Sequence, residues 1–142
     1  MRTFRIFGAG EWGLAVANHL SCLGHNVEIF LRNDNKISEF NKLRAYKDLG
    51  LSFNQNVIFN NLSDLNTLSS TKDIFNIIAS SSSGFANIIN SYRLYFKSCE
   101  SIVWLTKGLD HDSGLLFHEI IDQELSPSIN KCIISGPSFA KD

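Results

Sequence analysis

Short runs of hydrophobic residues alternate along this chain with longer stretches in which hydrophobic residues recur every three or four positions. The short runs predict buried strands, and the recurring pattern predicts helices that bury one face. Strands that alternate with helices are typical of an α/β protein with a parallel sheet. The predicted strands are 3–7, 26–31, 56–59, 73–79, 101–105 and 131–135.

Four helices are predicted between these strands. The first covers 12–23 and ends at Gly24, because glycine readily terminates a helix. The last is expected to begin at a cap supplied by Asp112 or Ser113. The Asn-rich segment 50–66 is expected to hold only the strand at 56–59. The remaining predicted helices cover 33–44, 84–96 and 114–125.

Composition and charge narrow the class of protein. The chain has 142 residues, of which 44% are hydrophobic and 19% are charged. This is typical of one globular domain with a sizeable core. A net charge of −1 provides no general attraction for nucleic acid or an anionic membrane, so neither is expected as a partner. No hydrophobic run reaches the roughly 18 residues of a membrane-spanning helix, and we expect a cytoplasmic protein.

Cysteine and histidine spacing argues against disulfides and metal sites. Cys22, Cys99 and Cys132 are odd in number and far apart, which favours reduced thiols. The four histidines show none of the paired spacings of zinc proteins. No metal is therefore predicted.

The stretch FGAGEWG contains the pattern G-x-G-x-x-G at Gly8, Gly10 and Gly13. It directly follows a predicted strand and opens a predicted helix, which is the context of a dinucleotide-binding loop. The first glycine permits the tight turn, the second lets the backbone approach a pyrophosphate, and the third lets helix and strand pack closely. The alternative is an ordinary strand-to-helix turn. The pattern predicts a doubly wound, mostly parallel, Rossmann-like sheet with helices on both faces.

An acidic residue, Glu11, lies inside this loop. A carboxylate in the first turn of a helix is favoured by the helix dipole, by about 0.3–1 kcal/mol at exposed sites. We therefore expect its side chain to face solvent and to tolerate the cofactor phosphates without helping to bind them.

The end of the second strand predicts the cofactor. NAD sites place an acidic residue roughly 20 positions after the last glycine, whereas an arginine there meets the 2′-phosphate of NADP. Arg32 occupies this position, with Lys36 nearby, and favours NADP. Asp34 keeps NAD open, while Glu28 lies too early, inside the strand. The alternative for Arg32 is a solvated surface side chain.

Three motifs, in order, resemble a known family. They are GAGEWGLAVANHL (8–20), VWLTKGLD (103–110) and ISGPSFAKD (134–142). The set resembles bacterial-type NAD(P)-dependent glycerol-3-phosphate dehydrogenases, and the resemblance extends over essentially the whole chain. It implies reversible hydride transfer between NAD(P)H and dihydroxyacetone phosphate, giving sn-glycerol 3-phosphate for glycerophospholipid synthesis.

The resemblance also implies roles for individual residues. Lys107 is implied as the catalytic residue, in contact with both nicotinamide and substrate. Gly136 and Ser138 are implied, with Lys107, as substrate-binding residues. The implied cofactor-binding residues are Gly8, Gly10, Glu11, Trp12, Gly13, Arg32, Tyr46, Lys107 and Ala140.

Some features depart from the family pattern. Glu11 stands where serine or alanine is frequent, Ser80 replaces a common proline, and Asp142 replaces a usual glutamate. Family members continue into a helical C-terminal domain that carries a general acid/base lysine and the groups that grip the substrate phosphate. We therefore expect residues 1–142 to be the dinucleotide-binding domain only. For the longer protein, a homodimer is a possible assembly.

Two other readings remain at this point. One is a non-catalytic NAD(P)-binding module that acts as a sensor or as a partner-recognition domain. The other is a different reductase with the same loop, such as a ketopantoate-type enzyme. The latter is not expected to share T-K-G together with G-P-S-F-A.

Overall fold

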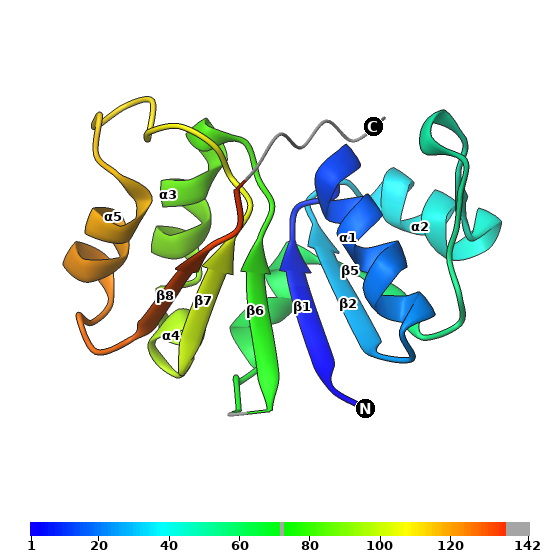
Figure 1. The fold of residues 1–142 in the computed structure, drawn as a ribbon, viewed down its shortest axis with the longest axis horizontal. Helices are drawn as coiled ribbons and strands as arrows, with labels where there is room; N and C mark the ends of the chain where they lie inside the picture. Colours follow the sequence, from blue (N-terminus) through cyan, green and yellow to red (C-terminus); the bar gives the residue numbers. More distant parts are fainter. Residues whose placement is uncertain (72, 136–142) are drawn as a thin grey trace.

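A computed structural model describes residues 1–71 and 73–135, and Figure 1 shows its fold. Six strands form one sheet in the order β5–β2–β1–β6–β7–β8, and all neighbours are parallel. All six predicted strands are confirmed. Their bounds are β1 Thr3–Phe7, β2 Asn26–Leu31, β5 Val57–Asn61, β6 Ile74–Ile78, β7 Ser101–Trp104 and β8 Asn130–Ile133.

The sheet changes direction at its centre. From β1 the chain adds β2 and β5 on one side, and then returns to add β6, β7 and β8 on the other. In doubly wound sheets, ligands bind outside the carboxyl ends of the strands at this switch point. The place to examine for a site is therefore the space above the ends of β1 and β6.

Helices cover both faces of the sheet, as predicted. On one face, α1 (Glu11–Cys22) and α2 (Asp34–Leu43) pack over β1, β2 and β5. On the other face lie α3 (Ser82–Ser91), α4 (Arg93–Lys97) and α5 (Phe117–Glu124) (Figure 1). The sheet thus separates two hydrophobic cores, one around Leu14 and Phe40 and the other around Phe85 and Phe117.

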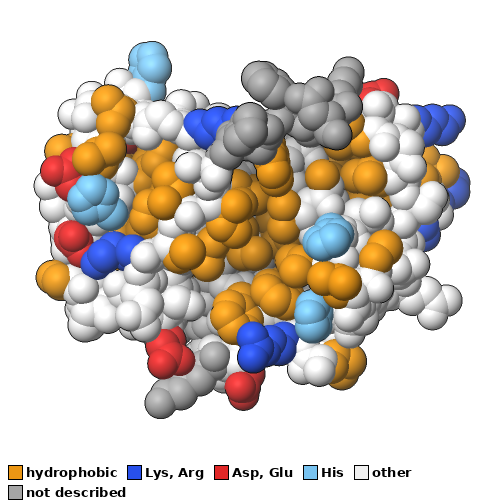
Figure 2. All heavy atoms as spheres, viewed as in Figure 1, with side chains coloured by type: hydrophobic (Ala, Val, Ile, Leu, Met, Phe, Trp, Pro, Cys, Tyr) orange, Lys and Arg blue, Asp and Glu red, His pale blue; other side chains and the backbone are white. Residues whose placement is uncertain are grey.

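The face that carries α1 is covered unevenly. Figure 2 shows hydrophobic side chains gathered over the middle of the sheet, beside α1. By strand register, Val103 and Cys132 lie side by side on this face, where Val103 is half-buried and Cys132 is exposed. Helices shield this face at its β1–β2–β5 half.

Two predicted helices differ from the structure. The helix expected over 84–96 begins at Ser82 and breaks at Tyr92 into α3 and α4. The helix expected over 114–125 begins only at Phe117, so the predicted cap at Asp112 or Ser113 is wrong. Ser113 is instead held in a turn by Asp110.

The cap of α5 comes from a side chain inside the helix, and not from the residue that precedes it. Leu116 precedes the helix in an extended conformation, and its backbone N–H donates to the Glu119 carboxylate over 2.8 Å. A glutamate at the third helical position therefore caps this helix from inside.

The segment between α2 and β6 holds more structure than expected. A hairpin pairs β3 (Ala45–Tyr46) with β4 (Leu51–Ser52). Two 3₁₀ helices are also present: η1 (Lys47–Leu49) connects the two hairpin strands, and η2 (Leu62–Thr67) follows β5. The expectation that 50–66 holds only one strand is therefore wrong. Strands of two residues are too short to produce a hydrophobic pattern.

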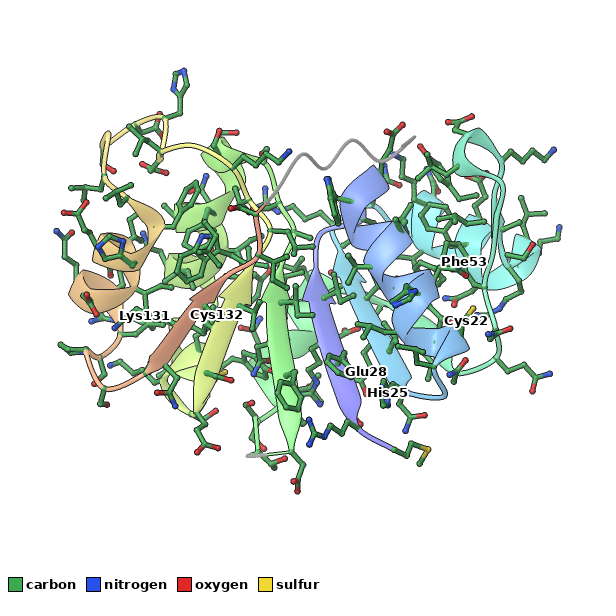
Figure 3. All side chains as sticks on the ribbon, viewed as in Figure 1. Cys22, His25, Glu28, Phe53, Lys131 and Cys132 are labelled. Carbon is green, nitrogen blue, oxygen red and sulfur yellow. The ribbon has the colours of Figure 1, made fainter. Side chains whose placement is uncertain are left out.

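The structure holds all three cysteines as free thiols. Cys22, at the end of α1, and Cys132, on β8, lie far apart across the sheet (Figure 3). Cys99 is buried, and this burial raises the pKa of its thiol to about 11. Among the described helices, none has the length and hydrophobicity needed to cross a lipid bilayer.

Candidate cofactor site

The glycine loop joins β1 to α1 at the switch point. Gly8 has a φ of 118°, and a Cβ there would lie 2.5 Å from the carbonyl oxygen of Ala79, just after β6. A Cβ on Gly13 would lie 2.6 Å from the Gly8 oxygen and 3.1 Å from the Ala79 Cβ. Both glycines are therefore required, Gly8 by its turn and by its contact with Ala79, and Gly13 by the close packing predicted for the third position of the motif.

Gly10 differs from the other two glycines. It is exposed, and no described atom lies within 4 Å of a Cβ built on it. It precedes α1 in an extended conformation, with no side-chain cap for the first N–H groups of the helix. Open space beside the first N–H groups of a helix is what a pyrophosphate needs in order to bind. The loop therefore fits a dinucleotide.

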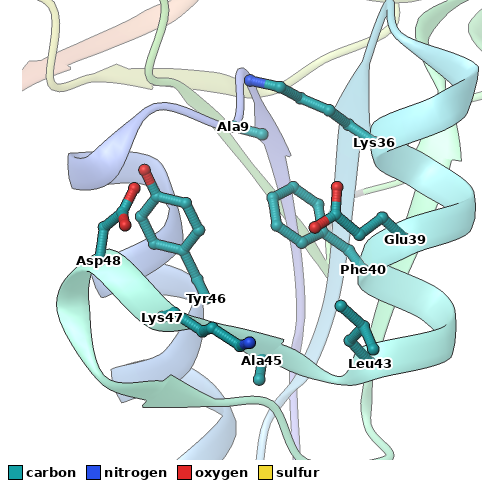
Figure 4. Close-up of a pocket in the computed structure, with 9 residues that line it drawn as sticks. All are labelled: Ala9, Lys36, Glu39, Phe40, Leu43, Ala45, Tyr46, Lys47 and Asp48. Carbon is teal, nitrogen blue, oxygen red and sulfur yellow. The ribbon is translucent and has the colours of Figure 1, made fainter.

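Two cavities flank the loop. A cavity of about 400 Å³ lies between Ala9, α2 and the β3–β4 hairpin (Figure 4). A second cavity, of about 210 Å³, lies above the ends of β6 and β7. Their positions on opposite sides of the loop suit a ligand with two ends joined by phosphates. The smaller cavity is lined by Trp12, Ala79, Ser80, Leu105, Thr106 and Lys107.

Lys107 lies immediately beyond β7, on a loop that the fold holds in place. Thr106 is buried, and its hydroxyl donates to the Ser80 carbonyl over 3.0 Å. Gly108, with a φ of 89°, then turns the chain. The structure thus brings Lys107 and Trp12 to one cavity.

Asp110 shapes the rest of this loop. Its carboxylate accepts the Ser113 backbone N–H over 2.9 Å and the Ser113 hydroxyl over 2.8 Å. These hydrogen bonds lower the pKa of Asp110. The turn after Lys107 therefore depends on an ionised aspartate.

The larger cavity contains Tyr46, one of the predicted residues. Its ring meets Phe40 edge-on at 6.0 Å, and its hydroxyl lies near Asp48 (Figure 4). Desolvation, a hydrogen bond with Asp48 and the negative charges of Asp48 and Glu11 raise the pKa of Tyr46. Glu11 is exposed as expected, and its charge acts on Tyr46.

The residues from Arg32 to Lys36, which we call the ribose corner, follow β2. Arg32 is exposed and is not among the residues that line the larger cavity, whereas Lys36 lines it and extends toward Ala9 (Figure 4). The Asp34 carboxylate accepts a hydrogen bond from Asn61 over 2.6 Å. Sequence reasoning missed Asn61, since nothing in its local pattern pairs it with Asp34.

Glu28, which lies too early in the sequence to read the ribose, has a structural role instead. It pairs with the buried Arg5 over 2.6 Å across neighbouring strands. Both residues lie well inside the strands, away from the loop. The remaining predicted residues, Gly136, Ser138 and Ala140, lie outside the described part of the chain.

Sequence comparison decides the family. Residues 4–142 match the model of the family described as NAD-dependent glycerol-3-phosphate dehydrogenase N-terminus. This chain belongs to that family. The match confirms the resemblance inferred from the three motifs.

Individual relatives agree with the family match. The chain is 35% identical over 144 residues to glycerol-3-phosphate dehydrogenase (NAD(P)+) of Legionella pneumophila (strain Paris), covering 99% of this chain and 42% of the relative. It is 30% identical over 148 residues to the Hydrogenovibrio crunogenus protein of the same name, covering 99% and 41%. The chain therefore spans about two fifths of the length of these curated relatives.

Solved structures show the same fold. The crystal structure of glycerol-3-phosphate dehydrogenase from Coxiella burnetii matches with a TM-score of 0.78 and 25% identity, covering 99% of this chain and 42% of that one. A putative 2-dehydropantoate 2-reductase from Enterococcus faecalis matches with a TM-score of 0.64 and 14% identity, covering 92% and 40%. The second likeness shows the fold alone, and the family match favours the dehydrogenase over the ketopantoate-type alternative.

Proposed function

We propose that this chain is the cofactor domain of an enzyme that interconverts dihydroxyacetone phosphate and sn-glycerol 3-phosphate with NAD(P)H. The observation that carries the proposal is the glycine loop, which packs against Ala79 at the switch point and leaves Gly10 open between two cavities. Membership of the family supplies the reaction and the substrate class.

The bound nicotinamide would supply the hydride, and the chain's own residues would bind and orient. The loop and the first N–H groups of α1 would hold the pyrophosphate. Tyr46, Arg32 and Lys36 would hold the adenosine half, and Trp12 the nicotinamide half. This division follows from the positions of Tyr46 and Trp12 in different cavities.

Lys107 would act on the substrate. Lys107 lines the smaller cavity together with Trp12. A fixed cation at this place polarises a carbonyl and stabilises the negative charge that develops on its oxygen during reduction. The hydrogen bond between Thr106 and Ser80 holds the backbone that carries it.

Cofactor binding tests the first half of the proposal. In calorimetry the 142-residue chain should bind one NADPH or NADH. Gly10→Asp retains a good helix cap but puts a carboxylate beside the phosphates, and should weaken binding at least about tenfold, or 1.4 kcal/mol. Gly10→Asn is the uncharged matched control and should lose less. A wild-type chain that binds neither cofactor would contradict the proposal.

Turnover tests the second half. Residues 1–142 alone should reduce dihydroxyacetone phosphate negligibly, because the proton donor and phosphate-binding groups of the family lie in its C-terminal domain. Positioned proton transfer typically contributes about 10²–10⁴-fold. In a longer polypeptide that continues as the relatives do, NADPH oxidation should be rapid, and Lys107→Ala should slow it sharply. Enzyme-like turnover by 1–142, abolished by Lys107→Ala, would contradict the expected division of labour.

A further inference from the structure

The ribose corner is linked to the next strand by one side-chain hydrogen bond. Asn61, the last residue of β5, lies level with Leu31 at the end of β2 in the sheet register. Its amide nitrogen donates to Asp34 Oδ1 over 2.6 Å. Asp34 is the first residue of α2, so this contact fixes a carboxylate at the very start of the helix.

The orientation of the Asn61 amide is set by its other contacts. Its Oδ1 accepts the Ser63 backbone N–H over 2.9 Å and the Ser63 hydroxyl over 2.8 Å. The Asn61 backbone N–H in turn donates to Asp64 Oδ2 over 3.1 Å, which completes a capping box at η2. With its oxygen committed to η2, the amide can offer only its NH₂ group to Asp34.

Holding Asp34 changes what the corner presents to a nucleotide. An acidic side chain after the second strand favours NAD by accepting hydrogen bonds from the ribose diol. The bond to Asn61 directs this carboxylate toward β5. In the part of the chain described, neither Arg32 nor Lys36 forms an ion pair.

Opposing charges also face this space. Glu39 and Asp48 line the larger cavity together with Lys36 and Lys47, so the cavity as a whole is balanced. A released Asp34 carboxylate would add a further negative charge beside a 2′-phosphate. The position of the Asp34 carboxylate therefore decides whether the ribose corner prefers NADPH or NADH.

We propose that Asn61 is a positioning residue that sets cofactor preference, holding Asp34 against β5 and leaving the ribose corner to Arg32 and Lys36 for the 2′-phosphate of NADPH. This rests on the proposed cofactor-binding function. Asn61 does not touch the nucleotide in this account. It acts through Asp34, so a change at Asn61 is expected to alter the ratio of the NADPH and NADH affinities.

The test measures dissociation constants of NADPH and NADH for the 142-residue chain by calorimetry. Asn61→Asp keeps an oxygen for the Ser63 cap but replaces the donor to Asp34 by a repelling carboxylate. It should shift the NADPH:NADH affinity ratio toward NADH by about tenfold, or 1.4 kcal/mol. Asp34→Asn should change the ratio by less than about threefold, or 0.7 kcal/mol, because the held carboxylate does not act on the ribose.

The double variant Asn61→Asp with Asp34→Asn restores both the pairing and the net charge of these two residues. It exchanges the partners, so an amide at 34 can donate to a carboxylate at 61 and no free carboxylate reaches the ribose. The ratio should return to within about threefold, or 0.7 kcal/mol, of the wild-type value. An unchanged ratio in Asn61→Asp, equal losses for both cofactors, or failure of the double variant to restore the ratio would overturn the inference alone. A wild-type chain that binds neither cofactor would overturn the proposed function as well.

Discussion

Gly13 packs so closely against Gly8 that a Cβ added to Gly13 would lie 2.6 Å from the Gly8 carbonyl oxygen. The first turn of α1 is therefore pressed onto the end of β1. This contact aims the start of the helix at the switch point, where no described atom lies within 4 Å of a Cβ built on Gly10. The geometry of the proposed phosphate site depends on an absent side chain.

Gly13→Ala should damage both the fold and the site. The added methyl group must push α1 away from β1, and overpacking of this kind typically costs about 1–3 kcal/mol. Denaturant unfolding should show this loss, and NADPH titration should show weaker binding. Gly10→Ala is the matched control, because its Cβ would enter open space and should leave the free energy of unfolding nearly unchanged. Equal destabilisation by both variants would contradict the packing argument.

Arg32→Asp should weaken NADPH binding more than NADH binding. The change replaces attraction by repulsion at the proposed position of the 2′-phosphate, which NADH lacks. Arg2→Asp makes the same charge change at an exposed residue before β1, and should affect the two cofactors equally. Titration calorimetry that finds equal losses for Arg32→Asp would show that this side chain does not read the ribose.

Glu11→Ser should change NADPH affinity by less than about tenfold, or 1.4 kcal/mol, since the carboxylate is exposed. Its charge does reach Tyr46, whose pKa it raises. Glu11→Gln should therefore lower the pKa of Tyr46 in an ultraviolet titration, with Tyr46→Phe used to assign the signal. A large gain in affinity would mean that Glu11 opposes the cofactor phosphates.

Asp110 should make stability depend on pH in the acid range. Hydrogen bonds from Ser113 lower its pKa in the folded state below that of the unfolded chain, about 3.9. The contribution is therefore complete above the unfolded pKa and is lost as the pH falls through the folded one. Asp110→Asn should reduce stability at neutral pH and flatten this acid-side slope in urea titrations. A slope identical to that of the wild type would show that Asp110 makes no such contribution.

The sequence predicted the sheet because each strand is a hydrophobic run bounded by polar residues. It also predicted the glycine loop, since Gly8 and Gly13 are required by contacts within one strand-to-helix unit. Local signals did not predict the start of α5. There, Asp110 binds Ser113 in a turn. The helix begins only after Leu116, whose backbone N–H is bound by the Glu119 carboxylate. Several sequences of polar residues can cap a helix, and only the folded chain selects one.

Contacts between distant segments were the least predictable. Asn61 reaches Asp34 across 27 positions, and Thr106 reaches Ser80 across 26. Neither pair has a periodic signal, because each depends on which strands become neighbours. The motifs name candidate site residues from the sequence alone, whereas the residues that position them are identified only in the structure.

The most direct test of the account is a map of backbone amide shifts when NADPH is added to the isotope-labelled 142-residue chain. We expect the largest changes at residues 8–13, at Tyr46 and at residues 106–108, on both sides of the loop. The cavity of about 310 Å³ near Ser69 and Tyr95 offers an internal comparison and should be silent. Changes centred on the cavity of about 310 Å³, or none at saturating NADPH, would contradict the assignment of this domain as the cofactor-binding part of a dehydrogenase.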